Sequence, residues 1–377
     1  MDPKQAQDTA VLIPSYKPDH KLAPYVSALR EAGFVKIVIV DDGSGPEFAP
    51  VFDAIPQDDR VHVIHYEPNG GKGVALKRGM QYLWEECPQC AYVITADSDG
   101  QHTVPDTLRM CESLHQESDG LLLGSRDFSQ SNIPAKSLLG NRITSAVFFL
   151  LYGRWVSDTQ TGLRGFARDL LPDMMAVRGD RYEYEMNMLI RCASQKIPLC
   201  KIAIETVYEN NNEGSHFRAV QDSARVYGVI FAGFFRFISA SLVSFLVDFG
   251  LYLLLNNLLR AYVPALEHNF RFLFVSILTR ILVATVVARL ASGVINFFLN
   301  KRLVFFDQSA VGRPFRRYLC VFFLVMLLSA SLTSSLHLWL GISDNAAKIP
   351  VDIVLFMLSY QLQQKWVFAG PGRKKKA

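Results

Sequence analysis

The sequence predicts an α/β domain with a mostly parallel sheet, followed by an all-α transmembrane domain of four helices. Up to about residue 220, short β-branched runs alternate with helical stretches, and this alternation is typical of a parallel sheet. Beyond residue 229, the apolar runs reach the ~20 residues that a bilayer-spanning helix needs. The 377 residues leave room for both parts, and the net charge of +4 indicates little by itself.

The change in composition sets the expected domain boundaries. We expect the α/β domain at residues 1–213 and a juxtamembrane amphipathic helix at 214–230. The transmembrane domain is expected at 231–370 and a basic tail at 371–377. The four spans are expected at about 233–255, 272–298, 318–340 and 349–369.

The expected sheet brings several polar motifs to one edge. Strands are expected at residues 11–16, 35–40, 61–66, 91–95 and 121–123, and helices at about 22–32, 73–86 and 105–116, with a further helix from Tyr182. Ligands of such sheets bind at the carboxyl ends of the strands. The motifs that lie there are Pro14-Ser15-Tyr16, Asp41-Asp42, Asp97-Ser98-Asp99 and Arg126.

The spacing of Asp97 and Asp99 suits a divalent cation that carries phosphates. Mg²⁺ and Mn²⁺ take oxygen ligands and complete their shell from substrate and water. An Asp-x-Asp pair alone is also common in surface loops, so the prediction depends on the other motifs at the same edge. Asn69-Gly70-Gly71-Lys72-Gly73 lacks the spacing of a P-loop, which disfavours a P-loop ATPase.

The cysteines predict neither a disulfide framework nor a zinc site. Cys87 and Cys90 form a C-x-x-C pair, but a zinc site needs a second pair of ligands at matching spacing, and none is evident in the sequence. We interpret them as two thiols near a helix end.

Five motifs in order resemble those of the family 2 inverting glycosyltransferases. They are Ile13-Pro14-Ser15-Tyr16, Val40-Asp41-Asp42-Gly43-Ser44, Asn69-Gly70-Gly71-Lys72-Gly73, Asp97-Ser98-Asp99-Gly100-Gln101-His102 and Gly124-Ser125-Arg126. The resemblance covers about residues 9–225 and is nearest to the polyprenyl-phosphate sugar synthases, such as dolichol-phosphate mannose synthase and the bactoprenol glucosyltransferases. It implies a GT-A fold.

The resemblance also implies roles for individual residues. The nucleotide-sugar donor is assigned to Pro14, Tyr16, Asp42, Lys72, Asp97 and Ser98. The metal, Mg²⁺ or Mn²⁺, is assigned to Asp97, Asp99 and Gln101. The phosphate of the acceptor is assigned to Arg126, with Lys136 or Arg142 as a second cation. Lys17 stands where many relatives have Asn or Glu, which leaves the donor's identity open.

Asp158 begins a segment, residues 158–166, that resembles the family's segment near the reacting centre. For an alcohol acceptor, Asp158 would be the natural general base. A lipid phosphate has a second pKa near ~6 and is already nucleophilic at neutral pH, so Asp158 would then orient rather than deprotonate. Both roles stay open, as do two interpretations of Glu185: a residue near the active site, or only the acidic start of a helix.

The Gln-x-x-Arg-Trp motif of processive family members is incomplete in this chain. Arg154-Trp155 is present, but Leu151 stands where the motif has Gln. The sequence therefore favours transfer of a single sugar over polymer synthesis.

Charges in and around the expected spans predict the topology. Residues 1–10 are polar and no signal peptide follows, so we expect the α/β domain in the cytoplasm. Basic residues gather between the second and third spans and in the tail, which places both chain ends on the cytoplasmic side. Within the spans, Asp248, Arg280, Arg289 and Asp352 are expected to face a bundle interior or to snorkel.

The second half carries an internal repeat. Residues 297–305 align with residues 360–368, and Arg236-Phe237 corresponds to Arg317-Tyr318, which predicts two hairpins in parallel orientation. This half resembles the GtrA-like family of four-span proteins, which implies a role in moving polyprenyl-linked sugars across the membrane.

The predicted function is inverting transfer of one sugar from a nucleotide sugar to polyprenyl phosphate at the cytoplasmic membrane. The donor is UDP-glucose or a similar sugar nucleotide, or GDP-mannose, and the product serves cell-envelope glycosylation. Membrane lipids are expected partners, nucleic acid is not, and a homo-oligomer stays open. Two alternatives remain: transfer to diacylglycerol or protein, and a role mainly as a transporter or scaffold for lipid-linked sugar.

Overall fold

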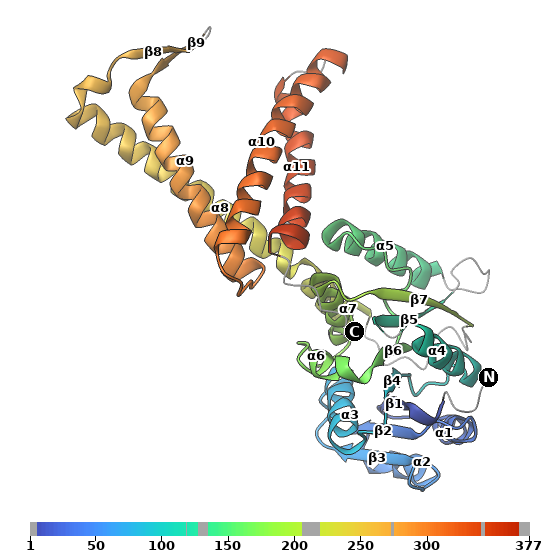
Figure 1. Cartoon of the computed structure of the whole chain (residues 1–377). Coiled ribbons are helices and arrows are strands. Elements are labelled where there is room, and N and C mark those ends of the chain that lie inside the picture. Colours follow the sequence, from blue (N-terminus) through green and yellow to red (C-terminus); the bar gives the residue numbers. More distant parts are fainter. Residues whose placement is uncertain are drawn as a thin grey trace. The chain divides into compact units, whose positions relative to one another are not determined.

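The structure is a computed structural model that describes residues 6–117, 119–126, 135–205, 219–272, 275–340 and 344–368 (Figure 1). The chain forms two compact units, of which the first ends at Ile230 and the second begins at Phe231. The first is an α/β unit and the second is helical, which confirms the predicted fold class. The expected tail at 371–377 and residues 214–218 of the expected juxtamembrane helix lie outside the described residues.

The first unit is built on a mixed sheet with the strand order β3-β2-β1-β4-β6-β5-β7. The strands are β1 (Thr9–Ser15), β2 (Lys36–Asp42), β3 (Val61–Tyr66), β4 (Tyr92–Thr95), β5 (Leu121–Arg126), β6 (Arg164–Ala167) and β7 (Leu199–Ile204). All neighbours are parallel except β6, which runs antiparallel to β4 and β5. The carboxyl ends of β1, β2, β4 and β5 therefore share one edge, as the sequence predicts.

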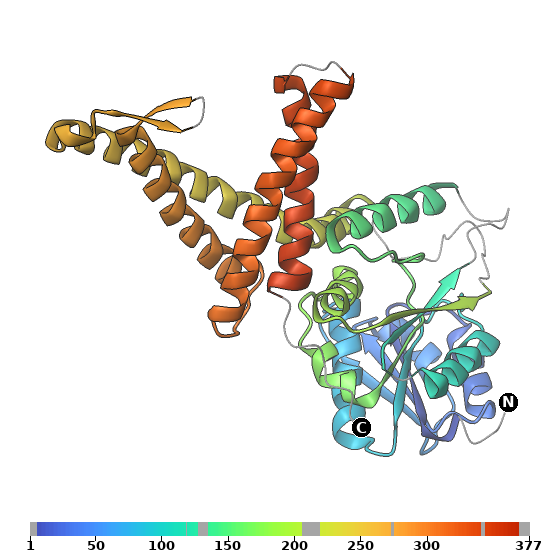
Figure 2. The ribbon, with the colours of Figure 1, turned by 45° about the horizontal axis from the view of Figure 1, so that its top comes forward.

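Two layers of helices cover the sheet (Figure 2). The helices are α1 (Leu22–Glu31), α2 (Ala49–Asp53), α3 (Lys72–Glu86), α4 (Val104–Gln116), α5 (Ala135–Tyr152), α6 (Leu171–Met175) and α7 (Glu183–Gln195), with 3₁₀ turns at Ala6–Asp8, Pro46–Phe48 and Arg168–Leu170. Apolar residues of α1, α2 and α4 pack on one face of the sheet. On the other face α3 lies close to β1, because a Cβ at Gly79 would stand 2.1 Å from Leu12 Cδ1.

The C-x-x-C pair is part of the end of α3. Cys87 and Cys90 are free, buried thiols. Arg168 Nη1 donates hydrogen bonds to the carbonyls of Leu83 (2.8 Å) and Cys87 (2.6 Å), which satisfies carbonyl groups left open at the helix end. The interpretation of these thiols as structural residues agrees with this packing.

The second unit consists of long helices joined by short segments. Its elements are α8 (Ala219–Tyr262, which starts in the first unit), a 3₁₀ turn (Pro264–Leu266), β8 (Asn269–Phe272), β9 (Val275–Leu278), α9 (Thr279–Leu299), α10 (Gly312–Leu340) and α11 (Asp344–Leu362). Among the described residues, three helical stretches are long and apolar enough to cross a membrane: Gln221–Tyr262, Thr279–Val304 and Gly312–Thr333.

Two of the four expected spans differ from the structure: the second in where its helix begins, and the fourth in its length. The second was expected to begin at residue 272, but β8 and β9 pair there and the helix begins only at Thr279. An apolar stretch reads alike in a strand and in a helix, so composition alone could not place this start. The fourth, expected at 349–369, overlaps the 19-residue α11 (Asp344–Leu362), which is not among the three membrane-length stretches.

The structure reproduces the internal repeat in its local geometry. A π-helix follows α9 at Asn300–Val304, and another follows α11 at the corresponding residues Gln363–Val367. The two corresponding polar residues bind each other, since Asn300 Nδ2 donates to Gln363 Oε1 at 3.0 Å. The corresponding rings of Phe305 and Phe368 stack at 5.1 Å between centroids. Corresponding positions of the two hairpins therefore contact each other.

Most charges in the expected spans have partners. Arg289 Nη2 lies 3.2 Å from Asp248 Oδ2, joining α9 to α8. The buried Arg280 lies 2.9 Å from Glu267 and donates to Asn256 Oδ1 at 2.6 Å. Pairing is the usual condition for a charged side chain at this depth.

Candidate active site

A cavity of about 510 Å³ opens at the carboxyl ends of β1, β2 and β4. All six residues assigned to the donor line it: Pro14, Tyr16, Asp42, Lys72, Asp97 and Ser98. Asp99 lines it as well. The structure therefore brings together side chains that lie up to 85 positions apart, from Pro14 to Asp99, at the edge where a parallel sheet binds ligands.

Asp42, at the end of β2, fixes the turn that leads into α3. Its carboxylate accepts hydrogen bonds from the backbone N–H groups of Gly70 (2.7 Å) and Gly71 (2.8 Å) and from the Tyr66 hydroxyl. Gly71 has φ +99°, and a Cβ there would stand 2.6 Å from Asp180 O. Only glycine fits this turn without strain, so the glycine run serves the backbone path to Lys72.

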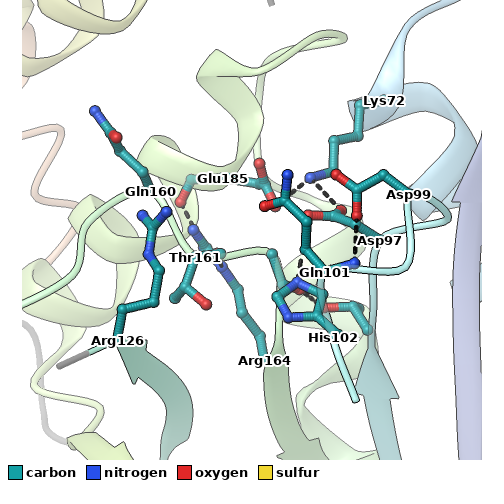
Figure 3. Close-up of polar contacts among 12 residues, drawn as sticks. Lys72, Asp97, Asp99, Gln101, His102, Arg126, Gln160, Thr161, Arg164 and Glu185 are labelled. Atoms are coloured by element: carbon teal, nitrogen blue, oxygen red, sulfur yellow. Dashed lines mark hydrogen bonds and ion pairs between the residues drawn. The ribbon is translucent and has the colours of Figure 1, made fainter. Parts of the chain in front are cut away.

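Lys72, the first residue of α3, bridges two carboxylates (Figure 3). Its Nζ lies 2.7 Å from Asp97 Oδ1 and 3.0 Å from Glu185 Oε1. Although burial opposes it, the Lys72 ammonium holds the pKa of the Asp97 carboxyl well below its usual range. Burial likewise opposes the charged form of Lys72, but Asp97 and Glu185 raise the pKa of its ammonium. Glu185, at the start of α7, thus lies in the site as well as at a helix start.

Asp99 differs from Asp97 in its surroundings. Burial and the neighbouring charge of Asp97 raise the pKa of the Asp99 carboxyl. Its Oδ1 accepts one hydrogen bond from the backbone N–H of Gln101 at 3.0 Å. The two carboxylates repel each other, and a bound cation would relieve this repulsion. The pair therefore suits a divalent ion. Among the residues that the structure describes, no group of three His, Cys, Asp or Glu side chains could hold a metal ion.

Asp158 and Arg126 form a second buried cluster. Arg126, at the end of β5, donates to the Asp158 carboxylate from Nε (2.7 Å) and Nη2 (2.9 Å), and Asp158 is 1 % exposed. The bidentate geometry is the strong form of such a pair. Asn141 on α5 holds the surrounding loop, donating to Ser157 O at 2.6 Å and accepting from Thr159 N at 3.0 Å.

The segment after Asp158 connects the two clusters. Thr95 Oγ1 donates to Gly162 O at 2.8 Å, and a Cβ on Gly162 would stand 2.3 Å from Asp97 Oδ2. Arg164, 1 % exposed, donates from Nη1 to the carbonyl of Glu185 at 2.7 Å. This residue of β6 therefore links the segment at 158–166, expected near the reacting centre, to the start of α7.

The remaining assigned residues are less close to the cavity. Gln101 lies beside Asp99 in Figure 3. Arg142 is exposed on α5, one residue after Asn141. Lys136 lies on the same helix, but its side chain is outside the described residues. Several cavity residues were not among those assigned from the sequence, and the polar ones that come late in the chain are Arg181, Tyr182, Asp222 and Arg225. They come from elements after β6, where no family motif drew attention to them.

Comparison with known proteins agrees with the fold and the motifs. Residues 10–174 match the family model "Glycosyl transferase family 2", and residues 236–368 match "GtrA/DPMS, transmembrane domain". UDP-N-acetylglucosamine–dolichyl-phosphate N-acetylglucosaminyltransferase of Methanococcus voltae is 28 % identical over 52 % of this chain and 85 % of that protein. Polyprenol monophosphomannose synthase of Mycolicibacterium smegmatis is 26 % identical over 53 % of this chain and 78 % of that protein.

Among solved structures, glucosyl-3-phosphoglycerate synthase from Mycobacterium tuberculosis, in complex with Mn²⁺, UDP and phosphoglyceric acid, matches with a TM-score of 0.47 at 14 % identity. The match covers 61 % of this chain and 79 % of that one. The two family models together account for the α/β unit and for the helical unit. The chain therefore combines a family 2 glycosyltransferase domain with a GtrA/DPMS transmembrane domain.

Proposed function

We propose that this protein transfers a single sugar from a nucleotide sugar to polyprenyl phosphate, with inversion at the anomeric carbon. The observation that carries the proposal is the cavity in which Asp42, Lys72, Asp97 and Asp99 meet, on a chain whose second half matches a GtrA/DPMS transmembrane domain. The names of the two relatives, which specify dolichyl phosphate and polyprenol acceptors, support a lipid phosphate as the acceptor.

The donor diphosphate would lie at the Lys72 end of the cavity. Asp97 and Asp99 would hold Mg²⁺ or Mn²⁺, with Gln101 as the third expected ligand. Such an ion supplies neutralisation of the charge that develops on the leaving diphosphate. Lys72 is positioned for the same charge, since its ammonium already lies against Asp97. Pro14, Tyr16 and Asp42 would hold the base and ribose.

The acceptor phosphate would be bound by Arg126. Its planar guanidinium suits a phosphate. Asp158 holds that guanidinium in place by accepting from its Nε and Nη2. An oxygen of the lipid phosphate would form the new bond to the anomeric carbon while the bond to the diphosphate breaks and its electron pair leaves with the nucleoside diphosphate. Because the phosphate is already an anion at neutral pH, no side chain has to remove a proton.

This geometry favours one of the two roles considered for Asp158. Both of its oxygens accept from Arg126, and Oδ1 also accepts from the backbone N–H of Gln160 at 3.1 Å. A carboxylate so occupied is a poor general base. We therefore infer that Asp158 positions Arg126, which is the arrangement expected for a phosphate acceptor rather than for an alcohol.

The proposed location is the cytoplasmic face of the plasma membrane, with both termini in the cytoplasm. Arg302, just after α9, and Arg313 and Arg316, at the start of α10, are exposed and give this end of the two helices a positive charge. Lys301 adds less, because it is buried and its Nζ lies 2.6 Å from Asp307 Oδ2. Nucleotide sugars are made on the cytoplasmic side, so this orientation would supply the donor.

Nucleotide release from a panel of donors tests the proposal. The purified full chain is incubated with UDP-glucose, UDP-N-acetylglucosamine and GDP-mannose, with Mg²⁺ or Mn²⁺, in the presence or absence of undecaprenyl phosphate. We expect release that requires both the lipid and one donor. Release that ignores the lipid would point to diacylglycerol or protein as acceptor. No turnover with any combination would favour a transporter or scaffold.

A further inference from the structure

The cavity has one wall that the assigned residues do not account for, formed by the first turns of α8. Asp222 and Arg225 both line the cavity in which Lys72 and Asp97 lie. Asp222 is 4 % exposed, and its Oδ1 lies 3.1 Å from Arg225 Nη1. The Arg225 side chain remains 49 % exposed. A buried carboxylate thus holds an arginine whose side chain is half exposed.

The packing of α8 fixes this wall within the α/β unit. Tyr227 OH lies 3.1 Å from Thr144 Oγ1, and Tyr152 OH donates to the carbonyl of Ile230 at 2.9 Å. Both contacts join α8 to α5, the helix whose Asn141 holds the loop of Asp158. The position of Arg225 is therefore set by the fold and not by a free helix end.

Tyr182 lines the same cavity as the α8 wall. Lys72 Nζ lies 6.0 Å from the centre of the Tyr182 ring, and Asp97, Asp222 and Arg225 line this cavity as well. The α8 wall therefore faces the cavity that holds the Lys72–Asp97 pair.

The negative charges in this cavity call for a further cation when a diphosphate binds. A diphosphate brings at least two negative charges to a region that already holds Asp97 and Asp99. Lys72 is already paired with two carboxylates. Among the described lining residues, the other cations are Arg181 and Arg225. Arg181 Nη1 lies 3.5 Å from Asn69 Oδ1, which is longer than a strong hydrogen bond.

We propose that Arg225 binds a phosphate of the donor diphosphate and that Asp222 is a positioning residue that holds its guanidinium at the cavity wall. The proposal rests on the proposed function and adds to it a donor contact from α8. An arginine fork matches phosphate oxygens in a bidentate manner, and such charge-assisted bonds are about twice as strong as neutral ones. The same helix continues to Tyr262, through the apolar stretch expected to cross the membrane.

Nucleotide binding to the full chain in detergent with Mg²⁺ tests this assignment. The probes are UDP and GDP, each compared with its nucleoside. For Arg225→Gln we expect at least about tenfold weaker binding of the preferred nucleoside diphosphate, in line with the loss of a charge-assisted hydrogen bond, and unchanged binding of the nucleoside. Arg225→Lys, which keeps the charge but not the fork, should fall between Arg225→Gln and wild type.

Matched variants distinguish binding from folding. Arg178→Gln removes an exposed arginine outside the cavity lining and should leave binding unchanged. Asp222→Asn should weaken diphosphate binding less than Arg225→Gln does and should lose its effect in the Arg225→Gln background. If Arg225→Gln melts well below wild type, Arg225→Lys takes its place in the comparison.

Three outcomes would overturn the assignment. Equal loss of nucleoside and diphosphate binding would show that Arg225 does not contact phosphate. A higher KM for undecaprenyl phosphate with intact diphosphate binding would assign Arg225 to the acceptor. If Arg225→Gln binds the nucleoside diphosphate as tightly as wild type does, Arg225 is not a donor contact, but the proposed function stands. If wild-type protein binds no nucleoside diphosphate, the proposed donor cavity itself is refuted.

Discussion

Two ion-paired clusters divide the residues of the site. Lys72 joins Asp97 to Glu185, and Arg126 is clamped by Asp158. The first cluster lies in the cavity at the ends of β1, β2 and β4, and the second lies at the end of β5. Each cluster holds one cation in a fixed place, so in the proposed reaction little reorganisation would be required when the phosphates bind.

Asp158→Asn tests the positioning role. The amide can accept only one of the two bonds from Arg126, so the guanidinium should lose its fixed orientation. We expect nucleoside diphosphate binding to stay within about twofold, while kcat/KM for the lipid falls about 10- to 100-fold, equivalent to the loss of one or two charge-assisted hydrogen bonds. The measurements are steady-state kinetics and nucleotide titration.

The pH profile of the same variant separates the two roles of Asp158. A positioning residue leaves the pH dependence of the residual activity unchanged, because the acceptor phosphate is the group that titrates. Loss of the acidic limb of the profile in Asp158→Asn would instead identify Asp158 as a general base.

Gly162→Ala tests the contact between the loop of Asp158 and the acidic pair. The added Cβ would stand 2.3 Å from Asp97 Oδ2, so the loop or the carboxylate must move. We expect at least a ~100-fold loss of turnover, since displacement of a reacting group by about 1 Å costs this much. Gly140→Ala is the control, because a Cβ there meets nothing within 4 Å. Full activity of Gly162→Ala would show that the placement of Asp97 is not critical.

At the scale of the elements, strong local patterns were predictable and weak ones were not. β3 was expected at 61–66 and lies there, because its β-branched and aromatic residues form a clear run. β6 has only four residues, Arg164–Ala167, with a buried arginine and a glycine, and neither residue type favours a strand. Its antiparallel pairing with β4 and β5 is a tertiary effect that no local pattern indicates.

The site was predictable to a similar extent. The residues expected at the strand ends do line one cavity, because the parallel sheet brings these strand ends together. The contact between Arg126 and Asp158 was not predicted, since the two lie 32 positions apart in the sequence. The place of Arg225 on the cavity wall was not predicted either, because the sequence indicated only a juxtamembrane amphipathic helix there.

The ion pair between α8 and α9 gives a prediction for the helical unit. Arg289→Leu would leave Asp248 in an apolar helix without its cation, although Ser292 Oγ still donates to it at 3.0 Å. An unpaired Asp at the centre of a membrane helix costs about 2.5–3.5 kcal/mol, so we expect a clear drop in melting temperature in nanodiscs. Asp248→Leu combined with Arg289→Leu should recover most of it, because neither charge is then left alone.

An exposed pair in the first unit serves as the control. Arg191 Nη2 lies 3.3 Å from Asp173 Oδ1, and both side chains are at least one-third exposed. Arg191→Leu should change stability by less than about 1 kcal/mol. If Arg289→Leu is as mild as this control, the Asp248–Arg289 pair does not face an apolar environment.

At the scale of the whole molecule, one chain joins a transferase domain to a helical unit with an internal repeat. The pairs Asn300–Gln363 and Phe305–Phe368 join corresponding positions of the two hairpins. In the proposed reaction, the polar cavity of the α/β unit would receive the soluble donor, and the apolar helices of the other unit would suit a lipid such as polyprenyl phosphate.

The most direct test of this account is detection of the product. The full chain, reconstituted with undecaprenyl phosphate, is given the preferred labelled donor and Mg²⁺, and the lipid phase is analysed by mass spectrometry and by NMR of the anomeric centre. We predict one sugar per lipid phosphate, with anomeric configuration opposite to that of the donor, and none of this product from Asp99→Asn. A labelled lipid with retained configuration, a polymer, or sugar found only on protein or diacylglycerol would contradict it.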